Sequence, residues 1–90
     1  MNIAIVGATG NVGRKTLEVL EKKEISIENL YLVASPKSAG KKIKFQGKEI
    51  EVYNLENFDF SKVKIAFFAA GGKISEKFAE KAAKYCLVID

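Results

Sequence analysis

Short apolar runs along the chain alternate with segments that mix apolar and charged positions. Four apolar runs, at residues 3–6, 30–34, 65–69 and 87–89, have the length of buried parallel strands. Residues 43–53 alternate with a period of two on either side of Gln46-Gly47-Lys48 and predict a hairpin or two extended pieces. Residues 35–42 are predicted to be a loop, because Pro36 cannot continue an interior strand, and residues 55–62 a loop with a helical turn.

Two segments, residues 11–23 and 75–85, carry apolar side chains at helical spacing. The predicted inward faces are Val12, Thr16, Leu17 and Leu20 in the first helix, and Ile74, Phe78, Ala82 and Tyr85 in the second. We also expect Tyr31, Tyr53 and Tyr85 to be partly buried packing residues. The order of the elements predicts an α/β fold, a Rossmann-like doubly wound and mainly parallel sheet with flanking helices. Residues 1–90 are expected to form one domain that is truncated at its C-terminus, because a strand of the buried type comes last.

Composition narrows the chemistry that this chain can perform. Its 90 residues carry a net charge of +4, no histidine and one cysteine, Cys86. A chain without histidine has no Ser/His or Cys/His pair, and its acidic residues show no metal-ligand spacing. We therefore expect no catalytic residue and no metal site, and we interpret Cys86 as structural because it lacks an activating partner.

The charge pattern and hydropathy limit the partners. The lysines of the second helix are interleaved with Glu76 and Glu80, and no stripe of basic and aromatic residues predicts nucleic-acid binding. No segment approaches the ~20 apolar residues that a membrane helix needs. The N-terminus has no signal-peptide pattern. We expect a soluble cytoplasmic protein with no membrane partner.

The strongest motif is Gly7-Ala8-Thr9-Gly10-Asn11-Val12-Gly13, directly between a predicted strand and a predicted helix. Gly7 would permit a tight turn, Gly10 would let a pyrophosphate approach the backbone, and Gly13 would let the helix pack closely on the sheet. The N–H groups of residues 9–12 would face the phosphates at a helix N-terminus. The cofactor-binding residues predicted in this turn are Gly7, Thr9, Gly10, Asn11 and Val12. An ordinary glycine-rich turn is the alternative.

The loop after the second strand indicates which dinucleotide binds. NAD-binding folds place an acidic residue about 20 residues beyond the glycines, where it binds the ribose 2′-hydroxyl. Residues 35–42 contain three lysines and no acid. Lysine and serine side chains bind a 2′-phosphate, which a carboxylate would repel. Ser35, Lys37 and Ser38 therefore favour NADP over NAD, with a merely solvated basic loop as the alternative.

Small residues follow the third apolar run, in the sequence Ala69-Ala70-Gly71-Gly72. Loops at the carboxyl ends of the strands line the ligand crevice of a doubly wound sheet. Small side chains there would allow a ribose or nicotinamide to pass close to the backbone. Ala70 and Gly71 are therefore predicted to lie against the cofactor, and a plain helix-entry turn is the alternative.

Together these motifs resemble the N-terminal domain of aspartate-semialdehyde dehydrogenase along essentially the whole chain. The family's Gly-Ala-Thr-Gly-x-Val-Gly is met by residues 7–13 and its Ala-Ser-x-x-Ser-x-Gly-Lys by residues 34–41. Its Phe-x-Ala-Gly-Gly-x-x-Ser is met by residues 68–75 and its Val-Ile-Asp by residues 88–90. The first motif is shared by many NADP proteins, whereas the motifs in this order are specific.

The resemblance implies a role for each motif. Residues 9–12 would hold the pyrophosphate, Ser35, Lys37 and Ser38 the 2′-phosphate, and Ala70 and Gly71 would lie near the nicotinamide. The family reductively dephosphorylates aspartyl phosphate to aspartate semialdehyde in the biosynthesis of lysine, threonine and methionine. It uses a cysteine thiolate, a covalent acyl-enzyme, a hydride from NADPH and a histidine as acid and base.

In the family, the catalytic residues and the substrate and dimerisation domain follow the segment matched here. The resemblance therefore implies that this chain alone lacks the catalytic residues, and that the intact enzyme is a homo-oligomer through the second domain. Three other interpretations stay open: a reductase acting on N-acetylglutamyl phosphate, a non-catalytic NADP-sensing domain, and a nucleic-acid binder. Residues 35–41 favour aspartate-semialdehyde dehydrogenase over the related reductase.

Overall fold

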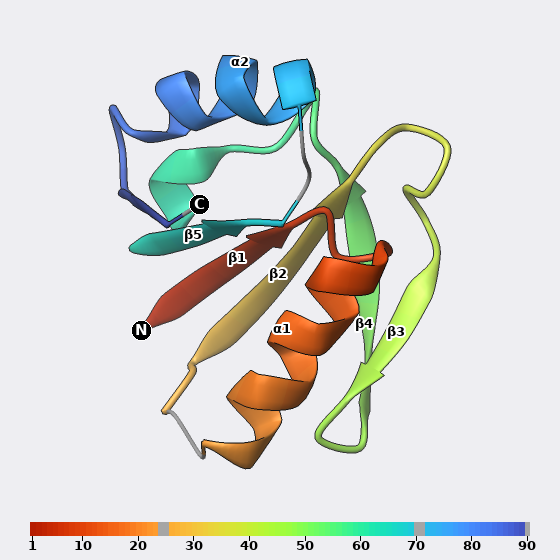
Figure 1. Ribbon diagram of the computed structural model, residues 1–90. Helices are drawn as coiled ribbons and strands as arrows, with labels where there is room; N and C mark the ends of the chain where they lie inside the picture. Colours follow the sequence, from red (N-terminus) through yellow and green to blue (C-terminus); the bar gives the residue numbers. More distant parts are fainter. Residues whose placement is uncertain (24–25, 70–71, 90) are drawn as a thin grey trace.

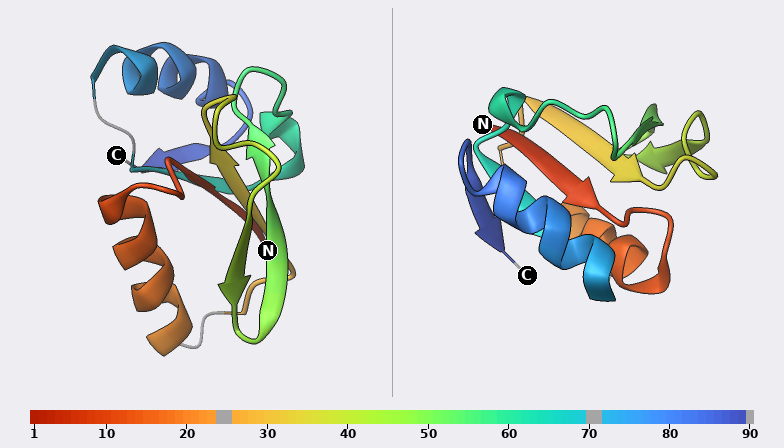
Figure 2. Two further views of the ribbon diagram at one scale, coloured as in Figure 1. Left: turned by 90° about the vertical axis from the view of Figure 1, so that its right-hand side faces the viewer. Right: turned by 90° about the horizontal axis from the view of Figure 1, so that it is seen from above.

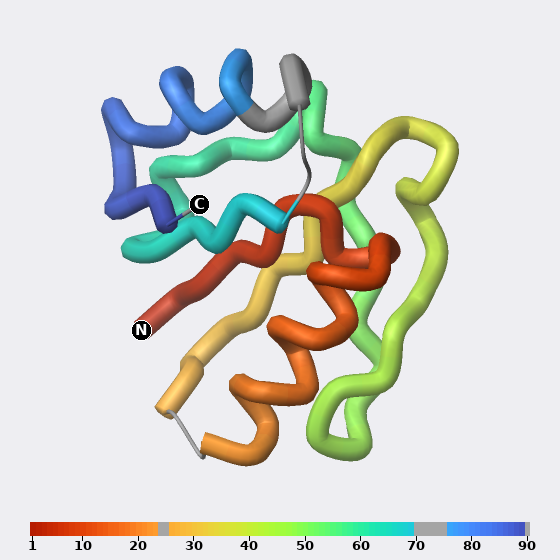
Figure 3. Tube along the Cα trace, in the orientation of Figure 1, coloured from red at the N-terminus to blue at the C-terminus, as the bar shows by residue number. Residues whose placement is uncertain are grey.

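Six strands form a sheet in the order β3-β4-β2-β1-β5-β6 in the computed structural model of the chain (Figure 1). The structure describes residues 1–23, 26–69 and 72–89, the side chains of residues 72–75 excepted (Figure 3). The strands are β1 (Asn2–Val6), β2 (Asn29–Ala34), β3 (Lys42–Phe45), β4 (Lys48–Asn54), β5 (Ile65–Phe68) and β6 (Leu87–Ile89). The helices are α1 (Asn11–Lys22), α2 (Gly72–Ala82) and the short 3-10 helix η1 (Phe60–Lys62).

The pairing of the strands confirms the predicted α/β fold. Strand β1 lies between β2 and β5, and these contacts, like β2–β4 and β5–β6, are parallel. Only β3 and β4 pair in the antiparallel sense among the described strands. They form the hairpin predicted for residues 43–53. Gln46 and Gly47 at its turn both have positive φ, of 50° and 80°. Two central residues of this kind suit the right-handed twist of the flanking strands.

Each face of the sheet is covered by a different helix (Figure 2). On one face, Ile3 and Ile5 of β1 pack in a cluster with Leu17 and Leu20 of α1. On the other face, Ala4 and Val6 belong to a cluster that includes Ala82 of α2 and the aromatic rings of Phe58, Phe60 and Phe68. Because side chains alternate along a strand, one apolar run supplies both halves of the core.

Helix α1 differs from the prediction on one flank. Leu17, Leu20 and Gly13 face the sheet and are buried, whereas Val12 is 62% exposed. The prediction that Val12 belongs to the inward face is therefore wrong. Gly13 occupies the inward position in the first turn instead, and Val12 is rotated by about 100° from it in a helix of 3.6 residues per turn.

Helix α2 begins and ends earlier than residues 75–85. Its last residue is Ala82, which is fully buried, and Phe78 is half-buried as predicted. Tyr85 lies beyond the helix and is 57% exposed, so the prediction that it belongs to the inward stripe is wrong. Tyr53 is also exposed, whereas Tyr31 is partly buried beside Phe58. The predicted contact of Ile74 lies outside the described side chains.

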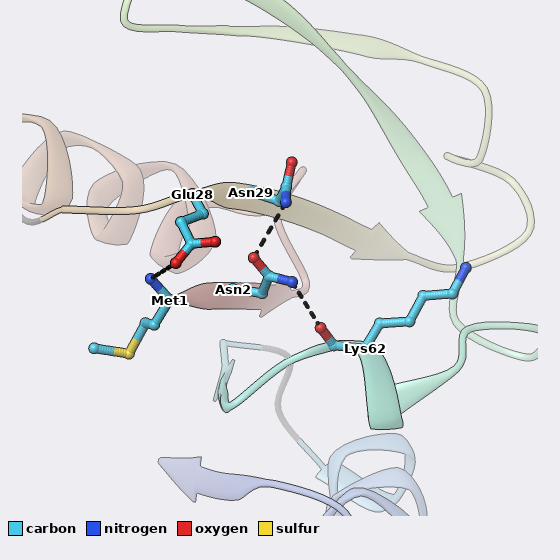
Figure 4. A network of polar contacts seen from close by, with 5 residues as sticks. All are labelled: Met1, Asn2, Glu28, Asn29 and Lys62. Atoms are coloured by element: carbon cyan, nitrogen blue, oxygen red, sulfur yellow. Dashed lines mark hydrogen bonds and ion pairs between the residues drawn. The ribbon is translucent and has the colours of Figure 1, made fainter.

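Polar contacts join the amino ends of the central strands (Figure 4). The Asn2 side chain donates to the Lys62 carbonyl at 3.1 Å and accepts from the Asn29 amide at 3.2 Å. The N-terminal ammonium lies 3.4 Å from a Glu28 carboxylate oxygen in an exposed ion pair, which contributes little. Asn2 thus connects β1 to β2 and to the segment that precedes β5, at the edge opposite the carboxyl ends.

Candidate functional site

The carboxyl end of β1 is a topological switch point. From β1 the chain passes through α1 to β2 on one side, and it later returns to β5 on the other side. Ligands of open α/β sheets bind in the crevice outside the carboxyl ends of the strands at such a point. The glycine-rich turn lies directly after β1 in this position (Figure 1).

Backbone hydrogen bonds hold the glycine-rich turn in place. The N–H groups of Gly7 and Ala8 both donate to the Val33 carbonyl, at 2.8 and 3.3 Å. Gly7 has a φ of 86°, which a residue with a side chain rarely adopts, and this conformation lets the chain leave β1 sharply. The Gly10 N–H donates to the Gly7 carbonyl at 3.1 Å, which closes the turn before α1 begins.

The glycines at positions 10 and 13 have different structural requirements. A Cβ atom on Gly13 would lie 2.1 Å from the Gly7 carbonyl oxygen and 2.8 Å from the Ala8 Cα. Gly13 thus lets α1 pack closely, as predicted, although its nearest neighbours belong to the turn after β1 and not to a strand of the sheet. A Cβ atom on Gly10 would meet only the Gly7 oxygen, at 3.5 Å, which is an ordinary contact. Neither its packing nor its φ of −82° requires a glycine at position 10 in the folded chain.

The first turn of α1 leaves backbone donors available. Gly10 provides no side-chain cap, and the first turn contains no acidic residue. The N–H groups of residues 11–13 have no partner within an α-helix, and among the described residues none of them has another backbone acceptor. Together with the positive end of the helix dipole, these donors can bind an anion. Asn11 and Gly10 are exposed beside them.

The segment after β2 forms a tight basic loop at the same edge. The N–H groups of Ser38 and Ala39 donate to the Ser35 carbonyl at 2.9 and 3.1 Å, which makes one turn of helix-like backbone. Gly40, with a φ of 91°, then directs the chain toward β3. Ser35 and Lys37 are exposed, and Lys37 forms no ion pair within the part of the chain that the structure describes.

One side-chain contact joins the two predicted phosphate-binding segments. The Thr9 hydroxyl donates to the Ser38 hydroxyl at 3.3 Å. The glycine-rich turn and the basic loop therefore lie side by side at the carboxyl edge of the sheet, although Thr9 and Ser38 are 29 residues apart. In this way the structure brings Gly7, Thr9, Gly10, Asn11, Val12, Ser35, Lys37 and Ser38 to one edge of the sheet.

A cavity of about 730 Å³ opens beside the basic loop, within the range of small-molecule sites. It lies between the ends of β2 and β4 on one side and α2 on the other. The lining residues are Ser35, Pro36, Leu55, Glu56, Lys77, Phe78 and Lys81. Leu55 and Glu56 were not among the predicted site residues. Their position directly after β4 could have indicated them, because it places them at the carboxyl edge.

The third predicted segment is only partly described. Ala70 and Gly71, predicted to lie near the nicotinamide, fall outside the described residues. The preceding Ala69 donates its N–H to the Val6 carbonyl at 2.8 Å. The segment that leads to α2 therefore starts beside the glycine-rich turn.

Cys86 and Asp59 lie in local surroundings that shift the pKa values of their side chains. The Cys86 thiol is half-buried and contacts the Ala82 carbonyl oxygen at 3.4 Å, and burial raises the pKa of this thiol. Asp59 accepts hydrogen bonds from the hydroxyl and the N–H of Ser61, which lower the pKa of the carboxyl group. Among the described residues, no group of three or more His, Cys, Asp or Glu residues is arranged to hold a metal ion. Within the same part of the chain, no helix has the length and apolar character to cross a membrane.

Known proteins share both the sequence and the fold of this chain. It is 50% identical to aspartate-semialdehyde dehydrogenase from Legionella pneumophila over 91 aligned residues, which cover 100% of the chain and 26% of that protein. It is 49% identical to aspartate-semialdehyde dehydrogenase 2 from Vibrio cholerae, over 98% of the chain and 26% of the relative. The chain thus spans about a quarter of the length of these curated relatives.

A solved structure agrees with these similarities. The crystal structure of aspartate semialdehyde dehydrogenase II from Vibrio cholerae complexed with ASA matches with a TM-score of 0.95 and 50% identity, over 99% of this chain and 29% of that one. The model of the family described as semialdehyde dehydrogenase, NAD binding domain, matches residues 2–90. The chain therefore belongs to the NAD-binding domain family of the semialdehyde dehydrogenases.

Proposed function

We propose that this chain binds NADP(H), with its pyrophosphate on the glycine-rich turn and its 2′-phosphate on the basic loop. The observation that supports this most strongly is the hydrogen bond between Thr9 and Ser38, at 3.3 Å. The adenosine ribose connects the pyrophosphate to the 2′-phosphate, so both subsites must lie within the length of one nucleotide. A contact between the two loops satisfies that requirement.

The proposed pyrophosphate site uses backbone rather than side chains. The unpartnered N–H groups at the start of α1 would donate to the phosphate oxygens. Gly7, Thr9, Gly10, Asn11 and Val12 form the turn that presents them, and Gly10 keeps the approach clear because it has no Cβ atom. Ala70 and Gly71 would lie toward the nicotinamide, since the chain leaves β5 beside this turn.

The proposed preference for NADP depends on charge. The Lys37 ammonium and the hydroxyls of Ser35 and Ser38 would bind the 2′-phosphate, and residues 35–42 carry no carboxylate to repel it. The adenine, which is attached next to the 2′-position of the ribose, would enter the cavity beside Ser35 and Pro36.

Calorimetric titration with NADPH and NADH tests this proposal. We expect NADPH to bind more tightly, and Lys37→Glu to weaken NADPH binding by about tenfold to a hundredfold with little effect on NADH, as for the loss of a charge-assisted hydrogen bond. Lys48→Glu is a matched control, because Lys48 is exposed at the opposite end of β4 and the change in net charge is the same. Equal affinity of the unmodified chain for both cofactors would overturn the proposed preference.

We further propose that the longer protein to which this domain belongs reduces aspartyl phosphate to aspartate semialdehyde with NADPH. The names of the relatives support this substrate over N-acetylglutamyl phosphate. In that protein the present chain would bind and orient the cofactor, which supplies the hydride, while other parts would contact the substrate. An assay of the full-length protein in the oxidative direction, with phosphate, NADP and either semialdehyde, would discriminate between the two substrates.

A further inference from the structure

The cavity beside the basic loop has one acidic residue in its lining. Glu56 lies there together with Ser35 and Pro36, while Lys77 and Phe78 of α2 form the opposite wall. Pro36 and Phe78 are apolar, and the Lys77 ammonium lies 5.6 Å from the centre of the Phe78 ring. A flat apolar body with a polar rim fits walls of this kind, and a purine is such a body.

The backbone fixes the place of Glu56 relative to the basic loop. Strands β2 and β4 are parallel with Ala34 opposite Asn54, so the residues that leave the two strands are neighbours. The Leu55 N–H donates to the Ala34 carbonyl at 2.8 Å, and the Leu55 side chain is buried in the core. The Glu56 N–H donates to the Asn54 side chain at 3.0 Å. Glu56 is thus held close to Ala34, the residue directly before Ser35 of the proposed 2′-phosphate subsite.

The Glu56 carboxylate is available to a ligand. It forms no ion pair among the described residues, although Lys77 and Lys81 line the same cavity. An ionised carboxylate only accepts hydrogen bonds. It therefore selects for a base that presents a donor and against a base that presents a carbonyl oxygen at the same position. Adenine has an amino group at C6, whereas hypoxanthine has a carbonyl group there.

On the basis of the proposed NADP site, we propose that Glu56 is a specificity-determining residue that accepts a hydrogen bond from the C6 amino group of adenine. The parts of the cavity have separate roles. Pro36 and Phe78 contact the two faces of the base, and Ser35 lies on the side of the ribose. Glu56 binds the edge of the base that carries the C6 substituent. The carboxylate then selects the adenine dinucleotide over its deaminated form.

The test compares NADPH with nicotinamide hypoxanthine dinucleotide phosphate in its reduced form. Both carry the same phosphates, so a general electrostatic effect of Glu56 changes both affinities equally and cancels in their ratio. We expect the unmodified chain to prefer NADPH by about tenfold, as for one hydrogen bond to a charged group. Glu56→Ala should reduce the ratio to near one, and so should Glu56→Gln, because a glutamine amide can accept from the adenine amino group through its oxygen and donate to the hypoxanthine carbonyl through its nitrogen.

Control measurements separate the possible failures. Glu49→Ala removes an exposed carboxylate from β4, away from the cavity lining, and should keep the full ratio. Thermal unfolding of each variant verifies that it is folded. If NADPH binds but Glu56→Ala leaves the ratio unchanged, the role of Glu56 is refuted while the NADP site stands. If neither dinucleotide binds the folded chain, the proposed function fails, and the role of Glu56 fails with it.

Discussion

Alanine substitutions at Gly10 and Gly13 distinguish the glycine that the fold requires from the glycine that cofactor binding requires. In Gly13→Ala, the new Cβ atom would lie 2.1 Å from the Gly7 oxygen and 2.8 Å from the Ala8 Cα. Both neighbours are backbone atoms, so no rotamer change relieves the clash. Overpacking of this kind costs about 1–3 kcal/mol or more. The gain of about 1 kcal/mol from alanine within a helix offsets only part of it.

We take the upper value of the overpacking cost, about 3 kcal/mol. Subtracting the gain of about 1 kcal/mol from alanine gives an expected net loss of about 2 kcal/mol for Gly13→Ala. For a domain of this size, it lowers the melting temperature by roughly 8–16 °C. Gly10→Ala should cost less than about 1 kcal/mol, because the new Cβ atom meets only the Gly7 oxygen, at 3.5 Å. The same variant should nevertheless bind NADPH poorly, since its methyl group occupies the proposed approach of the pyrophosphate.

Urea unfolding followed by circular dichroism measures both stabilities, and titration with NADPH measures the affinity of Gly10→Ala. The free energy of unfolding of Gly13→Ala should fall well below that of Gly10→Ala. If Gly13→Ala is as stable as the unmodified chain, the close packing of α1 on the turn is refuted. If Gly10→Ala binds NADPH normally while folded, the pyrophosphate does not approach at Gly10.

Three further predictions concern other parts of the fold. Asn2→Ala should lower the free energy of unfolding by about 1 kcal/mol, because it removes the hydrogen bonds that the Asn2 side chain forms with the Lys62 carbonyl and with the Asn29 side chain of β2. An unchanged urea midpoint would count against that network. The hydrogen bonds from Ser61 lower the pKa of Asp59 below 3.8, so the stability that Asp59 contributes is present above pH 4 and is lost as the pH falls through the lowered pKa. Asp59→Asn should therefore weaken the loss of stability between pH 4 and pH 2, and an identical acid profile would contradict this role. Burial raises the pKa of the Cys86 thiol above 9.0, so iodoacetamide at pH 8 should alkylate Cys86 more slowly in the folded chain than in the unfolded chain. Equal alkylation rates in the two states would refute the burial of this thiol.

The sequence predicted the strands well, because apolar runs and turn residues are local patterns. The runs that form β1, β2 and β5 are continuous and apolar, as buried parallel strands require. The turn at Gln46 and Gly47 also has a local cause, since glycine favours positive φ. The same loops that follow these strands then meet at one edge, which the parallel topology dictates.

The errors arose where packing overrides periodicity. Val12 fits an apolar helical stripe, but the inward position belongs to Gly13, whose missing side chain has no hydrophobic signal. Tyr85 continues the stripe of α2 by spacing, yet the helix ends at Ala82 and leaves the ring exposed. The position of Glu56 directly after β4 indicates the carboxyl edge of the sheet, but its place in the cavity depends on the register between β2 and β4, which a single sequence does not reveal.

Amide NMR of the labelled chain during titration with NADP⁺ tests most directly whether the glycine-rich turn and the basic loop share one nucleotide. We expect the largest shift changes at Asn11, Val12 and Ser38, and a much smaller change at Ser38 when NAD⁺ replaces NADP⁺. Changes confined to the β3–β4 turn, with these amides unmoved in saturating NADP⁺, would contradict the proposed site.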